Sequence, residues 1–121
     1  MTEKKRFLRL DSIVAYTQTE MDGDEIFIKF QGEKIAPRDG KFIKPAKEPV
    51  ALDVEVPVGD DLWVELELWE YDHFSPNDIL GKFRLLADEV SEGFSAELLT
   101  TKGAEQARYV LNWSVVERKN D

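Results

Sequence analysis

The sequence predicts an all-β fold, an antiparallel β-sandwich of about eight strands. Short runs in which apolar and polar residues alternate recur along its 121 residues, and segments rich in Gly, Pro, Asn and Asp separate them. Such alternation is typical of a strand with one buried face, and no stretch carries a strong helical period. The length fits a single domain, predicted to span residues 1–121 with its core at roughly 6–117.

The clearest strand patterns alternate apolar and polar residues over most of their length and are bounded by turn residues. They cover Phe7–Tyr16, Glu25–Gln31, Val50–Val56, Leu62–Trp69, Ile79–Leu86 and Arg108–Val116. The apolar positions of these runs should meet between the two sheets. The residues predicted to be buried there are Val64, Leu66, Leu68, Val54 and Ile28.

The remaining segments carry weaker patterns. Lys34–Ala36 and Lys41–Lys44 are interpreted as a hairpin around the turn residues Arg38–Gly40. After Leu86 the period of two is lost, and the prediction for Asp88–Val90 and Ala96–Leu99 is a short helical turn each.

The segment 31–49 is locally basic in an otherwise acidic chain. Two interpretations stay open for it. Lysines on an edge strand protect a sheet against pairing with another chain, and a basic face could also contact lipid headgroups. The basic residues are Lys34, Arg38, Lys41, Lys44 and Lys47.

Composition excludes several classes of function. The formal net charge of −9 argues against nucleic acid as a partner and against constitutive binding to anionic membranes. The chain has no cysteine, hence neither disulfides nor a thiolate metal site.

No signal peptide or apolar span of membrane length is visible, and a cytoplasmic location is expected. The single histidine, His73, has no catalytic motif around it, and the chain is not expected to be an enzyme.

The acidic stretch between the strands Leu62–Trp69 and Ile79–Leu86 is the main candidate for a site. It contains Glu70, Asp72 and Asp78, and the turn residues of Ser-Pro-Asn-Asp place it on a loop. Clustered carboxylates repel one another unless water or a cation relieves the repulsion. Calcium takes several oxygen ligands from flexible loops, so this spacing could supply them.

The same stretch resembles the third calcium-binding loop of a C2 domain, in a synaptotagmin-like form. The family pattern is Asp-x-Asp, five residues, Asp, two apolar residues and Gly. Here it reads Glu70-x-Asp72, five residues, Asp78, Ile79, Leu80 and Gly81. Between Asp72 and Asp78 the chain also carries Phe74 and Ser75, which match the Phe and Ser of synaptotagmin-type loops. The chain departs from the pattern at Glu70, whose longer side chain still offers two oxygens.

The resemblance also implies that the family's first calcium-binding loop, loop one, lies near residues 17–25. Asp24, which opens an apolar run, matches the family's loop-one aspartate, and either Glu20 or Asp22 would have to supply the other. Met21 and Phe74, near the loop tips, would be the residues that contact the membrane.

A C2-type sandwich with the circularly shifted, type II topology is expected, because the chain opens on the strand before loop one. In this arrangement Asp60 and Asp61 lie at the end opposite Asp72 and are poor ligand candidates.

Two classes of function follow from these observations. The first is a calcium-binding C2-like module, with Ca²⁺ as its cofactor, that docks to phospholipid membranes through its acidic loops as a peripheral membrane protein. The alternative is a calcium-independent β-sandwich that serves as a protein-interaction or structural module. The replacement of one loop-three aspartate by Glu70 and the unmatched loop-one partner favour the alternative.

Overall fold

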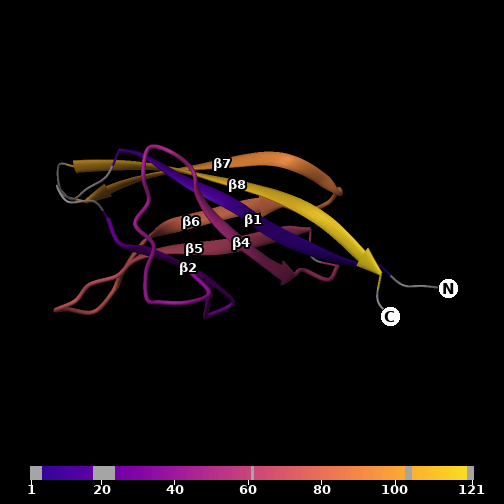
Figure 1. Cartoon of the computed structure of the whole chain (residues 1–121), viewed down its shortest axis with the longest axis horizontal. Helices are drawn as coiled ribbons and strands as arrows, with labels where there is room; N and C mark the ends of the chain where they lie inside the picture. Colours follow the sequence, from indigo (N-terminus) through magenta and orange to yellow (C-terminus); the bar gives the residue numbers. More distant parts are fainter. Residues whose placement is uncertain (1–3, 18–23, 61, 103–104, 120–121) are drawn as a thin grey trace.

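The computed structural model describes residues 4–17, 24–60, 62–102 and 105–119 as an antiparallel β-sandwich (Figure 1). Sheet A has the strand order β4-β1-β8-β7 and sheet B the order β3-β2-β5-β6. The described residues contain no helix long and apolar enough to cross a membrane. The strands are β1 (Lys4–Thr17), β2 (Ile26–Phe30), β3 (Glu33–Ala36), β4 (Val50–Pro57), β5 (Trp63–Glu70), β6 (Asp78–Leu86), β7 (Ser91–Lys102) and β8 (Glu105–Lys119).

The first and last strands pair with each other in the middle of sheet A. Their antiparallel register runs from Lys4 opposite Lys119 to Thr17 opposite Arg108. The two described ends of the chain therefore lie at the same end of the molecule, on the right in Figure 1.

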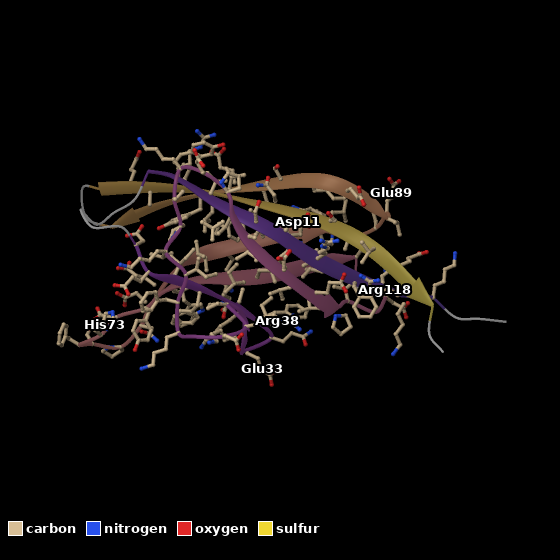
Figure 2. The ribbon with its side chains drawn as sticks, viewed as in Figure 1. Asp11, Glu33, Arg38, His73, Glu89 and Arg118 are labelled. Atoms are coloured by element: carbon tan, nitrogen blue, oxygen red, sulfur yellow. The ribbon has the colours of Figure 1, made fainter. Side chains whose placement is uncertain are left out.

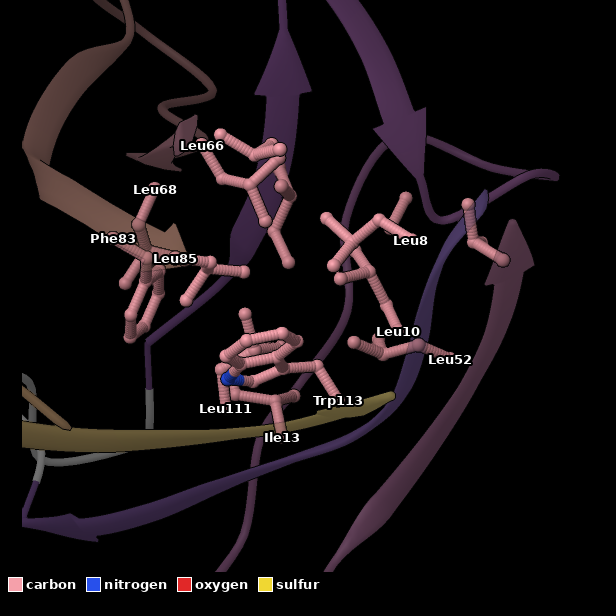
Figure 3. Packing of buried hydrophobic residues seen from close by; sticks show 14 of the residues in the cluster. Leu8, Leu10, Ile13, Leu52, Leu66, Leu68, Phe83, Leu85, Leu111 and Trp113 are labelled. Atoms are coloured by element: carbon pink, nitrogen blue, oxygen red, sulfur yellow. The ribbon is translucent and has the colours of Figure 1, made fainter. Parts of the chain in front are cut away.

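The core fills the space between the two sheets. Apolar side chains from sheet B, such as Leu66 and Phe83, meet those from sheet A, such as Leu10 and Trp113 (Figure 3). The alternation in the sequence places these side chains inward because successive residues of a strand point to opposite faces. All five residues predicted to be buried are confirmed as such: Val64, Leu66, Leu68, Val54 and Ile28.

The predicted hairpin around Arg38–Gly40 is wrong. Lys34–Ala36 instead belongs to β3, which pairs with β2 through a two-residue turn at Gln31 and Gly32. Both turn residues have positive φ, 52° and 83°, which matches the twist of the flanking strands. Ile43 forms only an isolated bridge, to Ile26. The interpretation of the basic segment as an edge strand holds for Lys34 alone: β3 is the outer strand of sheet B, whereas Arg38, Lys41, Lys44 and Lys47 lie between β3 and β4.

The predicted helical turns between residues 88 and 99 are also wrong. Residues 91–102 form β7, an edge strand of sheet A. Its period of two is present but shallow, with Phe94, Ala96 and Leu98 only partly buried against the core. Gly93, at φ 80°, lies in a register shift that interrupts the start of the strand.

Candidate functional site

Several connections meet at one end of the sandwich, which we call the loop end. β5 runs toward this end and β6 runs away from it, so the connection 71–77 lies here. The connection between β1 and β2 also ends here, because Ile26 at the start of β2 pairs with Glu70 at the end of β5. The segment 37–49 joins them through the bridge between Ile43 and Ile26.

The loop end gathers three of the predicted ligand residues, two of them on neighbouring strands and one just before a third strand. Glu70 lies opposite Ile26 of β2 on one side and opposite Asp78 of β6 on the other. Asp24 stands two residues before Ile26. The order β2-β5-β6 in sheet B therefore brings the backbones of Asp24, Glu70 and Asp78 to the same end of the sheet.

Asp24 and Glu70 are both buried, which is unusual for carboxylates. Asp24 is fully buried, and the hydroxyl of Tyr109 in β8 donates a hydrogen bond to its Oδ2. Tyr109 is fully buried as well. A buried carboxylate is costly unless donors or a cation compensate for the lost water. The partnership with Tyr109 was not foreseen from the sequence, because 85 positions separate the two residues.

Asp72 organises its own loop. Its Oδ1 accepts hydrogen bonds from the backbone N–H of Phe74 and of Ser75, at 2.9 and 3.1 Å, and its Oδ2 accepts one from the Ser75 hydroxyl at 2.6 Å. Its own N–H donates to Asn77 Oδ1 at 2.8 Å. These are the contacts of an aspartate that closes a turn.

His73 is not a solitary exposed residue. Its Nε2 lies 3.0 Å from Glu25 Oε2, and its ring packs edge-on against the rings of Tyr71 and Phe42, at centroid distances of 4.9 and 5.8 Å. The Tyr71 N–H also donates to the Glu25 carbonyl at 2.7 Å. These contacts connect loop 71–77 to the start of β2 and to segment 37–49.

The other predicted site residues fall into three groups. Phe74 is fully exposed at the loop tip, where a membrane contact requires it, and Asp78 is exposed. Asp60 lies before β5 and hence at the far end, as predicted. The remaining ones, Glu20, Met21, Asp22 and Asp61, lie outside the described residues.

The donor set fits a hard cation in its chemistry, because every candidate is a carboxylate. Within residues 4–17, 24–60, 62–102 and 105–119, however, no three His, Cys, Asp or Glu side chains are grouped closely enough to hold a metal ion.

A basic pocket lies beside the loop end, on the outer face of sheet B. Its volume is about 310 Å³. The Lys29 ammonium lies 4.5 Å from the ring centroid of Trp69, and that of Lys41 lies 5.8 Å from the ring of Tyr71. Lys34 donates to the Gly40 carbonyl. The lining residues are Phe27, Lys29, Lys34, Lys41, Tyr71 and Asn77.

The chain is similar both to a protein of known sequence and to solved structures. No family model matches the chain. Copine-E of Dictyostelium discoideum is 31% identical over 78 residues, which cover 61% of this chain and 14% of the copine. The structure of human GIVD cytosolic phospholipase A2 superposes with a TM-score of 0.54 at 14% identity, over 99% of this chain and 17% of that chain. The second similarity concerns the fold alone, and the chain corresponds to a small part of either protein.

Proposed function

We propose that this chain is a C2-like module that binds calcium at its loop end and docks there to phospholipid membranes. The observation that carries the proposal is the placement of Glu70 and Asp78 on the neighbouring strands β5 and β6, with Asp24 just before the adjacent strand β2 and Asp72 in the next loop. The third-loop motif, the pairing of the first and last strands and the similarity to Copine-E and the phospholipase support it.

Each loop-end residue would have a separate role in this function. Asp24 and Glu70 would present carboxylate oxygens from the buried floor, and Asp72 and Asp78 would present theirs from the more exposed rim. Bound calcium would neutralise these carboxylates and so remove their repulsion for anionic lipid. Phe74, which is fully exposed, would then enter the lipid surface.

The basic pocket would add an anion-binding contact to the same docking face. Its ammonium groups belong to Lys29, Lys34 and Lys41, which lie beside Tyr71 of the third loop. Lysines near an anionic membrane contribute about 1 kcal/mol each. The module would act at the cytoplasmic surface of a membrane and would not catalyse a reaction.

A second function, a calcium-independent interaction module, is favoured by a different observation. The Asp72 carboxylate already accepts three hydrogen bonds from its own loop, and the described residues form no closed metal cluster. In this case the loop end would recognise a protein directly, with its carboxylates serving to hold the loops in place.

Titration calorimetry with calcium distinguishes the two functions. We expect binding to the wild-type chain and strongly weakened binding in Asp72→Asn, which keeps the side-chain shape and removes one charge. Asp60→Asn is the matched control, since Asp60 lies at the far end and should leave binding unchanged. Equal weakening by the two substitutions would place the ion elsewhere, and no heat of binding in the wild type would leave the calcium-independent function.

Thermal unfolding gives a second readout of the same site. A ligand that binds only the folded state stabilises it by about 2.7 kcal/mol at a hundredfold excess over its dissociation constant. Calcium should therefore raise the melting temperature in a concentration-dependent way. Magnesium should raise it less, because magnesium requires a tighter octahedral geometry and releases water reluctantly.

A further inference from the structure

An exposed apolar patch lies at the far end of the sandwich, opposite the loop end. Four of the eight large apolar side chains exposed in the described part of the chain gather in this region. Trp63 is 53% exposed, and Trp63 and Leu86 lie opposite each other at the start of β5 and the end of β6. The members of this far-end patch are Leu62, Trp63, Leu86 and Val90.

The backbone beneath the far-end patch is held firmly. The Ala87 N–H donates to the Leu62 carbonyl at 2.6 Å. The Arg6 guanidinium donates to the carbonyls of both Ala87 and Gly59, at 2.5 and 3.1 Å, and so ties the turn before β5 to the turn after β6. Val58 and Ala87 are buried. A partner would meet a preorganised surface, which lowers the entropic cost of association.

The cations beside the patch are already engaged. The Arg84 guanidinium carbon lies 4.6 Å from the centroid of the Trp63 ring. The Lys82 ammonium lies 2.9 Å from a carboxylate oxygen of Glu65. Tryptophan and arginine are the residue types most enriched where interfaces bind tightly, so the stacked pair of Trp63 and Arg84 has the composition of an anchor.

Three exposed acidic side chains lie around the patch. Asp60, Asp88 and Glu89 are exposed, and none of them forms an ion pair with another described residue. Glu89 and the loop-end residue His73 lie at opposite ends of the molecule (Figure 2). The whole chain carries a formal charge of −9. A second copy would bring like charges together, whereas a cationic partner would be attracted.

We propose that the far-end patch is a docking surface for a basic amphipathic segment of a partner protein. The apolar side of the segment would cover Trp63 and Leu86, and its cations would face Asp60, Asp88 and Glu89. The surface goes beyond the proposed calcium and lipid function. Since β5 and β6 separate it from the loop end, both ends can be occupied at the same time.

The test uses the full chain and a synthetic amphipathic helix of lysine and leucine, about five turns long. Amide chemical shifts of the isotope-labelled chain locate the contact, and titration gives its affinity. We expect shifts at residues 59–63 and 84–90. Trp63→Ser should weaken binding by about tenfold or more. Leu99→Ser is the matched control, because Leu99 is 66% exposed on β7 of the other sheet and should change nothing.

Control peptides and further measurements test the alternatives, each of which would overturn the proposal. A lysine–serine helix that binds equally well would reduce the contact to charge, and a glutamate–leucine helix that binds equally well would remove the role of the acidic rim. Shifts confined to loop 71–77, or sedimentation that shows self-association through Trp63, would assign the patch another role. The double substitution Asp88→Asn and Glu89→Gln leaves the core untouched. It should weaken binding and lower its salt dependence even if Trp63→Ser proves unstable.

Discussion

Gly81 occupies the place where the edges of the two sheets meet, and its substitution tests the packing there. A Cβ built on Gly81 of β6 would lie 2.8 Å from Cδ1, 3.1 Å from Cδ2 and 3.3 Å from Cγ of Leu98 on β7. The backbone of Gly81 does not have a positive φ, so an alanine meets no backbone strain at this position. The whole effect of Gly81→Ala on the folded state should therefore come from this one contact.

Two opposing effects set the size of the change. Insertion of a methyl group into a filled space costs about 1–3 kcal/mol. Replacement of glycine by alanine at a compatible backbone position gains about 0.4–1 kcal/mol, because the unfolded chain loses freedom. We expect Gly81→Ala to lower the free energy of unfolding by about 1–2 kcal/mol in the wild-type background. In a Leu98→Ala background the clashing atoms are absent, and the same substitution should be stabilising.

Urea denaturation of the wild type, the two single variants and the double variant measures the change in the free energy of unfolding that Gly81→Ala causes in each background. The m-value should stay constant, since the change concerns local packing and not the compactness of either state. A coupling of about 2 kcal/mol between Gly81→Ala and Leu98→Ala is expected. Equal effects of Gly81→Ala in both backgrounds would refute the reasoning, because the sheets would then not be in contact at these residues.

Two further predictions concern charge. The hydrogen bond from Arg118 is the main cause that lowers the pKa of Glu55, so the pair contributes stability above the ordinary glutamate pKa of 4.5 and loses it as the pH falls through the lower folded-state value. Glu55→Gln should therefore unfold slightly more easily than wild type in urea at neutral pH, and the difference should disappear in acid; a difference that persists there would exclude the ion pair as its cause. In the basic pocket, Lys34→Gln and Lys41→Gln should each weaken binding to phosphatidylserine-containing vesicles about fivefold. Lys44→Gln, outside the pocket lining, is the control, and equal losses in all three would indicate a diffuse charge effect.

The strands with deep alternation could be predicted from the sequence because burial imposes a period of two. In β5, Val64, Leu66 and Leu68 are all at most 2% exposed, while the residues between them face outward or are partly covered. β7 was missed because it is an edge strand, where Leu98 is only partly buried and Leu99 is exposed. Because Leu98 and Leu99 are adjacent, both apolar and on opposite faces, the sequence does not alternate between apolar and polar residues at this point.

The turn between β2 and β3 could have been found. Gln31 and Gly32 separate two short runs by two residues, and a glycine in such a loop is typical of a hairpin with positive φ at both positions. The sequence offered a competing signal at Arg38–Gly40, which is richer in turn residues. Distance along the chain decided the outcome, since a two-residue loop closes at lower entropic cost than a longer one.

The candidate site could be located by its local motif, but its contacts could not. The pattern from Glu70 to Gly81 predicts an acidic loop between two strands, and a loop lies there at residues 71–77. The prediction that Glu70 and Asp78 belong to this loop is wrong, since they are the last residue of β5 and the first of β6. The partners of its side chains come from distant positions. Glu25 is 48 residues from His73, and Tyr109 is 85 residues from Asp24. Such pairs depend on which strands become neighbours, and a single sequence does not encode that in any local period.

These contacts change the expected energetics of the loop end. Clustered carboxylates alone would predict a strained apo state that any cation relieves. In the structure, however, Asp72 accepts three hydrogen bonds from its own loop, Asp24 accepts one from Tyr109, and Glu25 pairs with His73. Each donor offsets part of the repulsion, so a cation at Asp72 would have to compete with these hydrogen bonds. The calcium affinity should consequently depend on the loop contacts as much as on the number of carboxylates.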